Sequence, residues 1–158
     1  MRLLFTLLLF TLSFQPVQAE RLLVPMDNSQ RDHLKSYGLA FWTLERGIAV
    51  EWLLNYRGGA FLVDYHQLIA VEAQIRGISA VQISEAQAAQ IYAEIDGGNM
   101  DVVRLEKAPK IAVYTPPNTQ PWDDAVTLAL EYAQIDYEKI WDEEVLNGAL
   151  DDYDWLHL

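Results

Sequence analysis

The residues best suited to bind a ligand in the first half of the chain are an arginine and two glycines. Arg57 precedes Gly58 and Gly59 directly after an apolar segment. A guanidinium can hold a carboxylate through two parallel hydrogen bonds, while glycines allow backbone N–H groups to approach a ligand closely. The sequence therefore predicts a carboxylate-binding turn at 57–59. The alternative is an ordinary tight turn whose arginine is solvated.

A second candidate site lies after a predicted strand near the C-terminal end. The segment 115–119 combines hydroxyl and amide groups with two stiff prolines, and it lacks the glycines of a phosphate cradle. Trp122 follows, either as a cover over the core or as a stacking surface for a ligand. Ligands of parallel sheets bind at the carboxyl ends of the strands. We therefore expect a ligand to contact Thr115, Asn118, Trp122 and His157.

Catalytic and metal chemistry find little support in the residue types. The chain has no cysteine and no Gly-x-Ser-x-Gly motif, so neither a thiol nor a nucleophile elbow is present in the sequence. The three histidines are far apart and form no paired ligand spacing. The acidic run at 151–154 lacks the glycine and final glutamate of a calcium loop and is typical of a solvated turn. We expect no catalytic residue, no metal and no cofactor.

The N-terminal half alternates helices and strands. Apolar spacing and turn residues predict a helix at 30–46, strands at 50–56, 60–63 and 78–83, and a helix at 85–95. Ser84 with Gln87 is typical of a capping box. Asp64 with Gln67 suggests another, opening a helix that ends at Gly77, with an apolar stripe formed by Leu68, Val71 and Ile75. Residues 101–109 are expected to form a short extended connector.

The C-terminal half continues the alternation. Predicted elements are a strand at 110–114, a helix whose first turn contains Pro121, a strand at 137–141, a short helix from Asp142 to about Gly148, and a strand at 153–158. This order predicts an α/β protein with a mostly parallel, Rossmann-like sheet, helices on both faces and right-handed crossovers. Because 153–158 is apolar and has no polar tail behind it, we expect the sheet to be incomplete.

The first residues indicate export. Met1-Arg2 is a basic start, the run from Leu3 to Leu12 is almost entirely apolar, and Ala19 offers a small residue for cleavage before Glu20. The alternative is an uncleaved anchor, but the run is much shorter than the ~20 residues of a spanning helix. We therefore predict a signal peptide at 1–19 and an exported, soluble product, periplasmic or extracellular, without stable membrane insertion.

Composition limits the partners. The formal charge is −12, and the acids concentrate between Asp123 and Asp154, where Lys139 is the one base. Such a chain repels nucleic acid, so we expect no nucleic-acid partner. With 51% apolar residues the chain can bury a real core. The predicted organisation is a signal peptide at 1–19, an α/β unit at 20–109, and the start of a second α/β unit at 110–158.

Several segments resemble known families. Lys110-Ile-Ala-Val-Tyr114, Pro121-Trp-Asp-Asp-Ala125, Ala129-Leu-Glu-Tyr132 and Tyr153-Asp-Trp155 are similar to the first strand–helix–strand of class I glutamine amidotransferase-like domains. The stretch 23–158, including Leu53-Leu-Asn-Tyr-Arg-Gly-Gly-Ala60, resembles exported bacterial proteins labelled asparagine synthetase B. Asparagine synthetase B proper uses an N-terminal cysteine and a Ser-Gly-Gly-rich loop for ATP, and this chain has neither.

Two functions follow from these expectations. The first is a non-catalytic module, or fragment, that binds a small carboxylate- or amide-bearing ligand. The second is the N-terminal part of an amidotransferase or hydrolase whose catalytic residues lie beyond Leu158. The amidotransferase resemblance places the nucleophile on an elbow past the last strand of this chain, so no catalytic residue is carried over. The family label itself is glutamine-hydrolysing asparagine synthetase.

Overall fold

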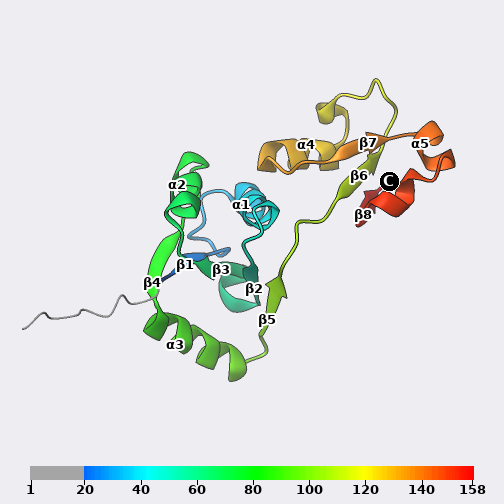
Figure 1. Ribbon diagram of the computed structural model, residues 1–158. Helices are drawn as coiled ribbons and strands as arrows, with labels where there is room; N and C mark the ends of the chain where they lie inside the picture. Colours follow the sequence, from blue (N-terminus) through cyan, green and yellow to red (C-terminus); the bar gives the residue numbers. More distant parts are fainter. Residues whose placement is uncertain (1–19) are drawn as a thin grey trace, which may run out of the picture.

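A computed structural model describes residues 20–158, so the predicted signal peptide at 1–19 lies outside the described residues. Two units follow one another along the chain (Figure 1). The elements of the first unit are β1 (Glu20–Val24), α1 (His33–Glu45), β2 (Val50–Leu54), β3 (Ala60–Asp64), α2 (Gln67–Ile75), β4 (Val81–Ser84), α3 (Glu85–Asp96) and β5 (Asp101–Leu105).

The first unit is built on an antiparallel sheet, not on the parallel sheet that the sequence predicted. Its five strands lie in the order β4-β1-β3-β2-β5, and every neighbouring pair is antiparallel. The first four strands with α1 and α2 follow the split β-α-β, or ferredoxin-like, connectivity. β2 and β3 are joined by residues 55–59 alone, which is too short for a parallel crossover. The hairpin places β3 between β1 and β2, so strands joined through α1 do not touch.

Helices cover both faces of this sheet. On one face α1 and α2 pack over a core that includes Leu22, Val50 and Val63. On the other face α3 packs over Leu53 and Leu62, both fully buried. Because strand residues alternate between faces, apolar residues on consecutive strand positions supply both cores. The predicted arrangement of helices on both faces is correct, although the sheet direction is not.

The second unit contains the only parallel sheet among the described residues. Its strands lie in the order β7-β6-β8, with β6 in the centre. The elements are β6 (Ile111–Tyr114), α4 (Ala125–Ala133), β7 (Glu138–Ile140), α5 (Asp142–Leu146) and β8 (Trp155–His157). Two short 3-10 helices, at Pro121–Asp123 and Ala149–Asp152, also belong to this unit, and a third, at Tyr56–Gly58, belongs to the first unit. Here the α/β alternation does produce parallel pairing, because each connection is long enough to cross over.

Helix α1 joins the two units, because it lies between the antiparallel sheet and α4. Gly38 is a position where α1 and α4 approach closely: an added Cβ would collide with the carbonyl oxygen of Ala133. Arg76 donates to the same carbonyl through Nη1 at 3.1 Å. Phe41, on the α4 side of α1, packs with Ile111 and Leu130 beneath the small sheet. One helix thus contributes to the cores of both units.

Two helices bury faces other than those that the sequence suggested. The predicted stripe of α2 points outward, with Leu68 59% and Ile75 74% exposed, while Ile69 and Ala73 are buried. The helix is apolar on both sides, so periodicity alone does not identify the inner one. The predicted cap at Asp64 is also wrong, because Asp64 ends β3. The capping box of Ser84 and Gln87 is confirmed at the start of α3.

None of the helices in residues 20–158 has the length and apolar character needed to cross a membrane.

Candidate functional site

Arg57 and its turn bind the loop that contains Asp27 and Ser29, an arrangement called the Arg57 clamp below. Arg57 donates through Nε to Asp27 Oδ2 at 2.6 Å and through Nη2 to Ser29 Oγ at 2.9 Å. Asp27 accepts hydrogen bonds from Arg57 and also from the hydroxyl and N–H of Ser29, and these bonds, the one from Arg57 first, lower the pKa of the Asp27 carboxyl from its usual range. The Met26 backbone N–H also donates to the Arg57 carbonyl at 3.0 Å. The guanidinium that was predicted to receive a ligand carboxylate already holds one from its own chain.

The glycines of this turn allow its backbone to adopt positive φ angles. Arg57, Gly58 and Gly59 all have positive φ, at 45°, 80° and 89°. Only glycine adopts such values without strain, and Gly58 also lies against the backbone of Met26. The Gly59 carbonyl accepts a hydrogen bond from Trp52 Nε1 at 3.1 Å. The turn is therefore tight, as in the alternative considered from the sequence, but its arginine is paired with Asp27.

The other four predicted residues belong to the second unit. Thr115 directly follows β6 and is buried, and its N–H donates to the Ile140 carbonyl at 3.0 Å. His157 pairs in register with Val113, so Thr115 and His157 lie toward the same carboxyl edge of the small sheet. Asn118 and Trp122 are exposed, the latter by 70%, so Trp122 does not cover the core.

Asp124 is a residue of this edge that the sequence analysis did not single out. It is the N-cap of α4, and its Oδ1 accepts from the N–H groups of Val126 and Thr127. The backbone hydrogen bond from Thr127, with lesser contributions from Val126 and His157, lowers the pKa of Asp124. Its other oxygen lies 4.0 Å from His157 Nε2. The helix-capping position before residue 125 was the sequence signal for it.

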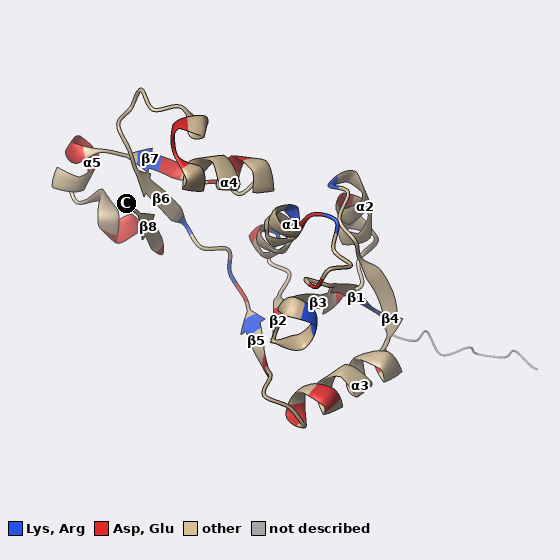
Figure 2. Ribbon diagram, turned by 180° about the vertical axis from the view of Figure 1, so that it is seen from behind, with Lys and Arg blue, Asp and Glu red and all other residues tan. Residues whose placement is uncertain are grey.

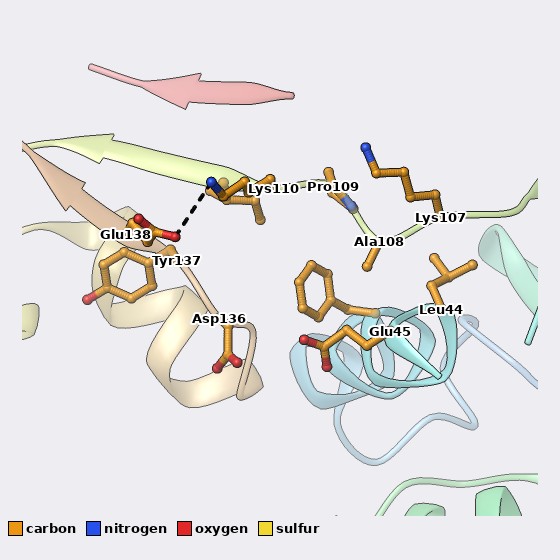
Figure 3. Close-up of a pocket in the computed structure, with 11 residues that line it drawn as sticks. Leu44, Glu45, Lys107, Ala108, Pro109, Lys110, Asp136, Tyr137 and Glu138 are labelled. Atoms are coloured by element: carbon orange, nitrogen blue, oxygen red, sulfur yellow. Dashed lines mark ion pairs between the residues drawn. The ribbon is translucent and has the colours of Figure 1, made fainter. Parts of the chain in front are cut away.

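A cleft lies elsewhere, between α1 and the small sheet. It has a volume of about 640 Å³ and is bounded by α1, the connector 106–110, and the turn that leads into β7. Its apolar lining consists of Phe41, Leu44, Ala108, Pro109, Ile111 and Tyr137. Figure 3 shows Leu44, Ala108, Pro109 and Tyr137 together with the charged residues around them. Clefts at the junction of two units are a common place for small-molecule sites. This one opens at the amino ends of β6 and β7, opposite to the predicted edge.

Both signs of charge surround the cleft. Lys107 and Lys110 come from the connector, whereas Glu45, Asp136 and Glu138 come from the two flanking walls. Figure 2 shows this basic connector between more acidic parts of the chain. Lys107 is bound by both oxygens of Asp154, at 3.1 and 3.0 Å. Lys110 is paired more loosely.

Lys110 is the cation at this cleft that is best placed to accept another partner. Its Nζ lies 3.9 Å from Glu138 Oε1, beyond hydrogen-bonding distance, and 4.7 Å from the centre of the Tyr153 ring. The Tyr153 hydroxyl donates to Glu138 at 2.7 Å, and this bond raises the pKa of Tyr153 to about 12. Glu138 is therefore held by Tyr153, and Lys110 can turn toward a ligand at little cost.

A second, more apolar groove lies along the same connector. It has a volume of about 510 Å³ and shares Phe41, Leu44, Lys107, Pro109 and Ile111 with the charged cleft. Trp52, Phe61 and the 45% exposed Trp155 also line it. A ligand at Lys110 would thus find apolar surface within the same junction.

The sequence contains one signal for this site. Bases are scarce in a chain of net charge −12, yet Lys107 and Lys110 flank Pro109 within four positions. Their acidic partners come from distant segments, and α1 and the turn that leads into β7 form the walls opposite them. No family model, curated protein or solved structure matches this chain.

Proposed function

We propose that this protein is an exported, non-catalytic module that binds a small carboxylate-bearing molecule in the cleft beside Lys110. The observation that carries the proposal is the loosely paired Lys110 at the rim of the charged cleft between the two units, whose lining also includes the apolar surfaces of Phe41 and Tyr137. The bound carboxylate would accept from Lys110 Nζ, and the apolar body would lie on Phe41 and Tyr137. The resemblance to exported proteins labelled asparagine synthetase B supports a ligand with a small acid or amide group.

Binding should depend on Lys110 and on the carboxylate. Titration of the full-length protein with 4-methylpentanoate, followed by calorimetry, should give saturable binding that Lys110→Ala weakens about tenfold, because a charge-assisted hydrogen bond is lost. The uncharged 4-methylpentanamide should bind more weakly than the acid.

Lys139→Ala is the matched control. Lys139 is also exposed and carries the same charge, but its Nζ donates to the Thr119 carbonyl at the other end of β7. Equal weakening by both substitutions would show that the net charge, and not the cleft, governs binding. Absence of saturable binding would contradict the proposal.

Export rests on residues 1–19 and is tested separately. Because the apolar run is short and Ala19 precedes Glu20, signal peptidase should cleave between them. Intact-mass measurement on protein recovered outside the cytoplasm should therefore give a chain that begins at Glu20. Soluble exported protein that retains Met1 would contradict cleavage.

The alternative proposal is the N-terminal part of an amidotransferase or hydrolase. It is favoured by the Asp124–His157 pair at the carboxyl edge of a parallel sheet, where enzymes of α/β architecture place their sites. Both outer strands of this sheet, β7 and β8, have one neighbour each in the described part of the chain. A longer form of the protein with a Cys or Ser on a strand-to-helix elbow and a later His would favour this alternative.

A further inference from the structure

A separate polar pocket lies on the α3 face of the antiparallel sheet. It has a volume of about 300 Å³, and its charged lining consists of Arg21, Glu51, Asp64, His66 and Arg104. Four of these residues lie on strands: Arg21 on β1, Glu51 on β2, Asp64 on β3 and Arg104 on β5. Their side chains are on the face of the sheet opposite to α1. Helix α3 covers the apolar part of this face and reaches the pocket through Tyr92, whose hydroxyl donates to Glu51.

Arg21 is the unusual residue of this pocket. Its side chain is only 13% exposed, and Nη2 donates to Glu51 Oε2 at 2.9 Å. Its Nε is buried and has no hydrogen-bond partner among residues 20–158. Asp64 Oδ1 lies 3.3 Å from that nitrogen, near enough for attraction between charges but not aligned for a hydrogen bond. A buried donor without an acceptor costs free energy, so an acceptor from outside the chain would be favoured.

The surrounding charges restrict what that acceptor can be. The guanidinium of Arg21 faces the carboxylates of Glu51 and Asp64, and that of Arg104 donates through Nε to Glu106 Oε1 at 3.1 Å. A carboxylate ligand would approach Asp64 and Glu51, and an ammonium ligand would approach the two arginines, so either charge meets repulsion. A neutral group that accepts a hydrogen bond on one side and donates one on the other is not repelled by the carboxylates or by the arginines.

We infer that this pocket binds a primary carboxamide. The amide oxygen would accept from Arg21 Nε, and the amide nitrogen would donate to Asp64 Oδ1, which is 76% exposed on its side chain and open to a ligand. Burial and the hydrogen bond to Glu51 raise the pKa of Tyr92 to about 12, so its hydroxyl keeps its proton and holds Glu51 in place at neutral pH. A pocket of this size exceeds the space of one water several-fold, at about 30 Å³ per water.

The test follows the Nε–H signal of Arg21 in nitrogen-15 NMR spectra of the full-length protein. Propionamide should shift this signal with saturation in the millimolar range, which is typical of such a small ligand. Propionate, which lacks the donor, and N,N-dimethylpropionamide, which lacks the N–H groups, should bind at least fivefold more weakly. Equal shifts from all three molecules would overturn the inference, as would a signal that no ligand moves, since water alone then serves Arg21.

Matched variants separate this pocket from general effects. Asp64→Ala removes the acceptor at an exposed position and should raise the dissociation constant of propionamide at least fivefold. Asp101→Ala removes an exposed carboxylate at the far end of β5 and should leave it unchanged. Equal effects of the two variants would contradict the assignment. Lys110→Ala should also leave propionamide binding unchanged, because its cleft is a different site.

Discussion

Replacing Gly38 with alanine should destabilise the protein, although alanine is the better helix former. Gly38 lies inside α1, where propensity alone predicts a gain of about 1 kcal/mol. The added Cβ would collide with the Ala133 carbonyl oxygen and lie 2.9 Å from Arg76 Nη1. Both atoms belong to the hydrogen bond that joins α2 to α4. We expect a net loss of about 2 kcal/mol, since overpacking of a tight contact outweighs propensity.

Urea unfolding gives the stability change, and hydrogen exchange locates it. Amides of α4 and the small sheet should lose protection more than those of β1 and β3, because α4 must move away from α1. Gly97→Ala is the control: Gly97 has φ −84° at the end of α3, and the nearest atom to an added Cβ lies 3.4 Å away. This control should be neutral or slightly stabilising. A stabilised Gly38→Ala variant would show that α1 and α4 are not in close contact.

Gly58→Ala should be the most damaging substitution in the Arg57 turn. At φ 80° an alanine is strained, and its Cβ would also collide with the Met26 carbonyl oxygen. That carbonyl belongs to the loop that Arg57 clamps through Asp27, so a shift to relieve the collision would disturb the clamp. Positive φ and the steric contact together should cost about 3 kcal/mol in the free energy of unfolding, measured by urea denaturation.

Gly47→Ala separates the two causes. Gly47 has a similar φ of 71°, but an added Cβ there has no atom within 4 Å. Conformational strain alone should then cost about 1 kcal/mol. If both substitutions have equal effects, the approach of Gly58 to Met26 contributes nothing, and the turn is held by its dihedral angles alone.

Local signals in the sequence predicted most of the elements. The capping box at Ser84 and the apolar spacing after it predicted a helix at 85–95, close to the observed Glu85–Asp96. Gly58 and Gly59 predicted a tight turn, which the structure confirms through their positive φ values. These features depend on residues within a few positions of one another, so the sequence carries them directly. β1 was missed because its five residues directly follow the segment interpreted as a signal peptide, although Pro25 and Asp27 supply a turn signal after it.

The sequence did not predict how the elements pair. An alternation of helices and strands is compatible with a parallel sheet, and it became antiparallel because the short 55–59 turn folds β3 back between β1 and β2. The same limit applies to the faces of α2: Leu68 and Ile75 are as apolar as Ile69, and only packing against the sheet decides which side is buried.

For the predicted site residues, the sequence likewise indicated the local surroundings but not the partners in space. The sequence by itself determined that Arg57 lies in a glycine turn and that Thr115 directly follows a buried strand. Only the tertiary structure decided that Arg57 is paired with Asp27, that His157 lies 4.0 Å from Asp124, and that Lys110 borders the cleft beside α1. Each of these contacts joins residues 28 or more positions apart in the sequence, or places a residue beside another helix. Such contacts arise from tertiary packing, because local sequence patterns specify only residues that are near one another in the chain.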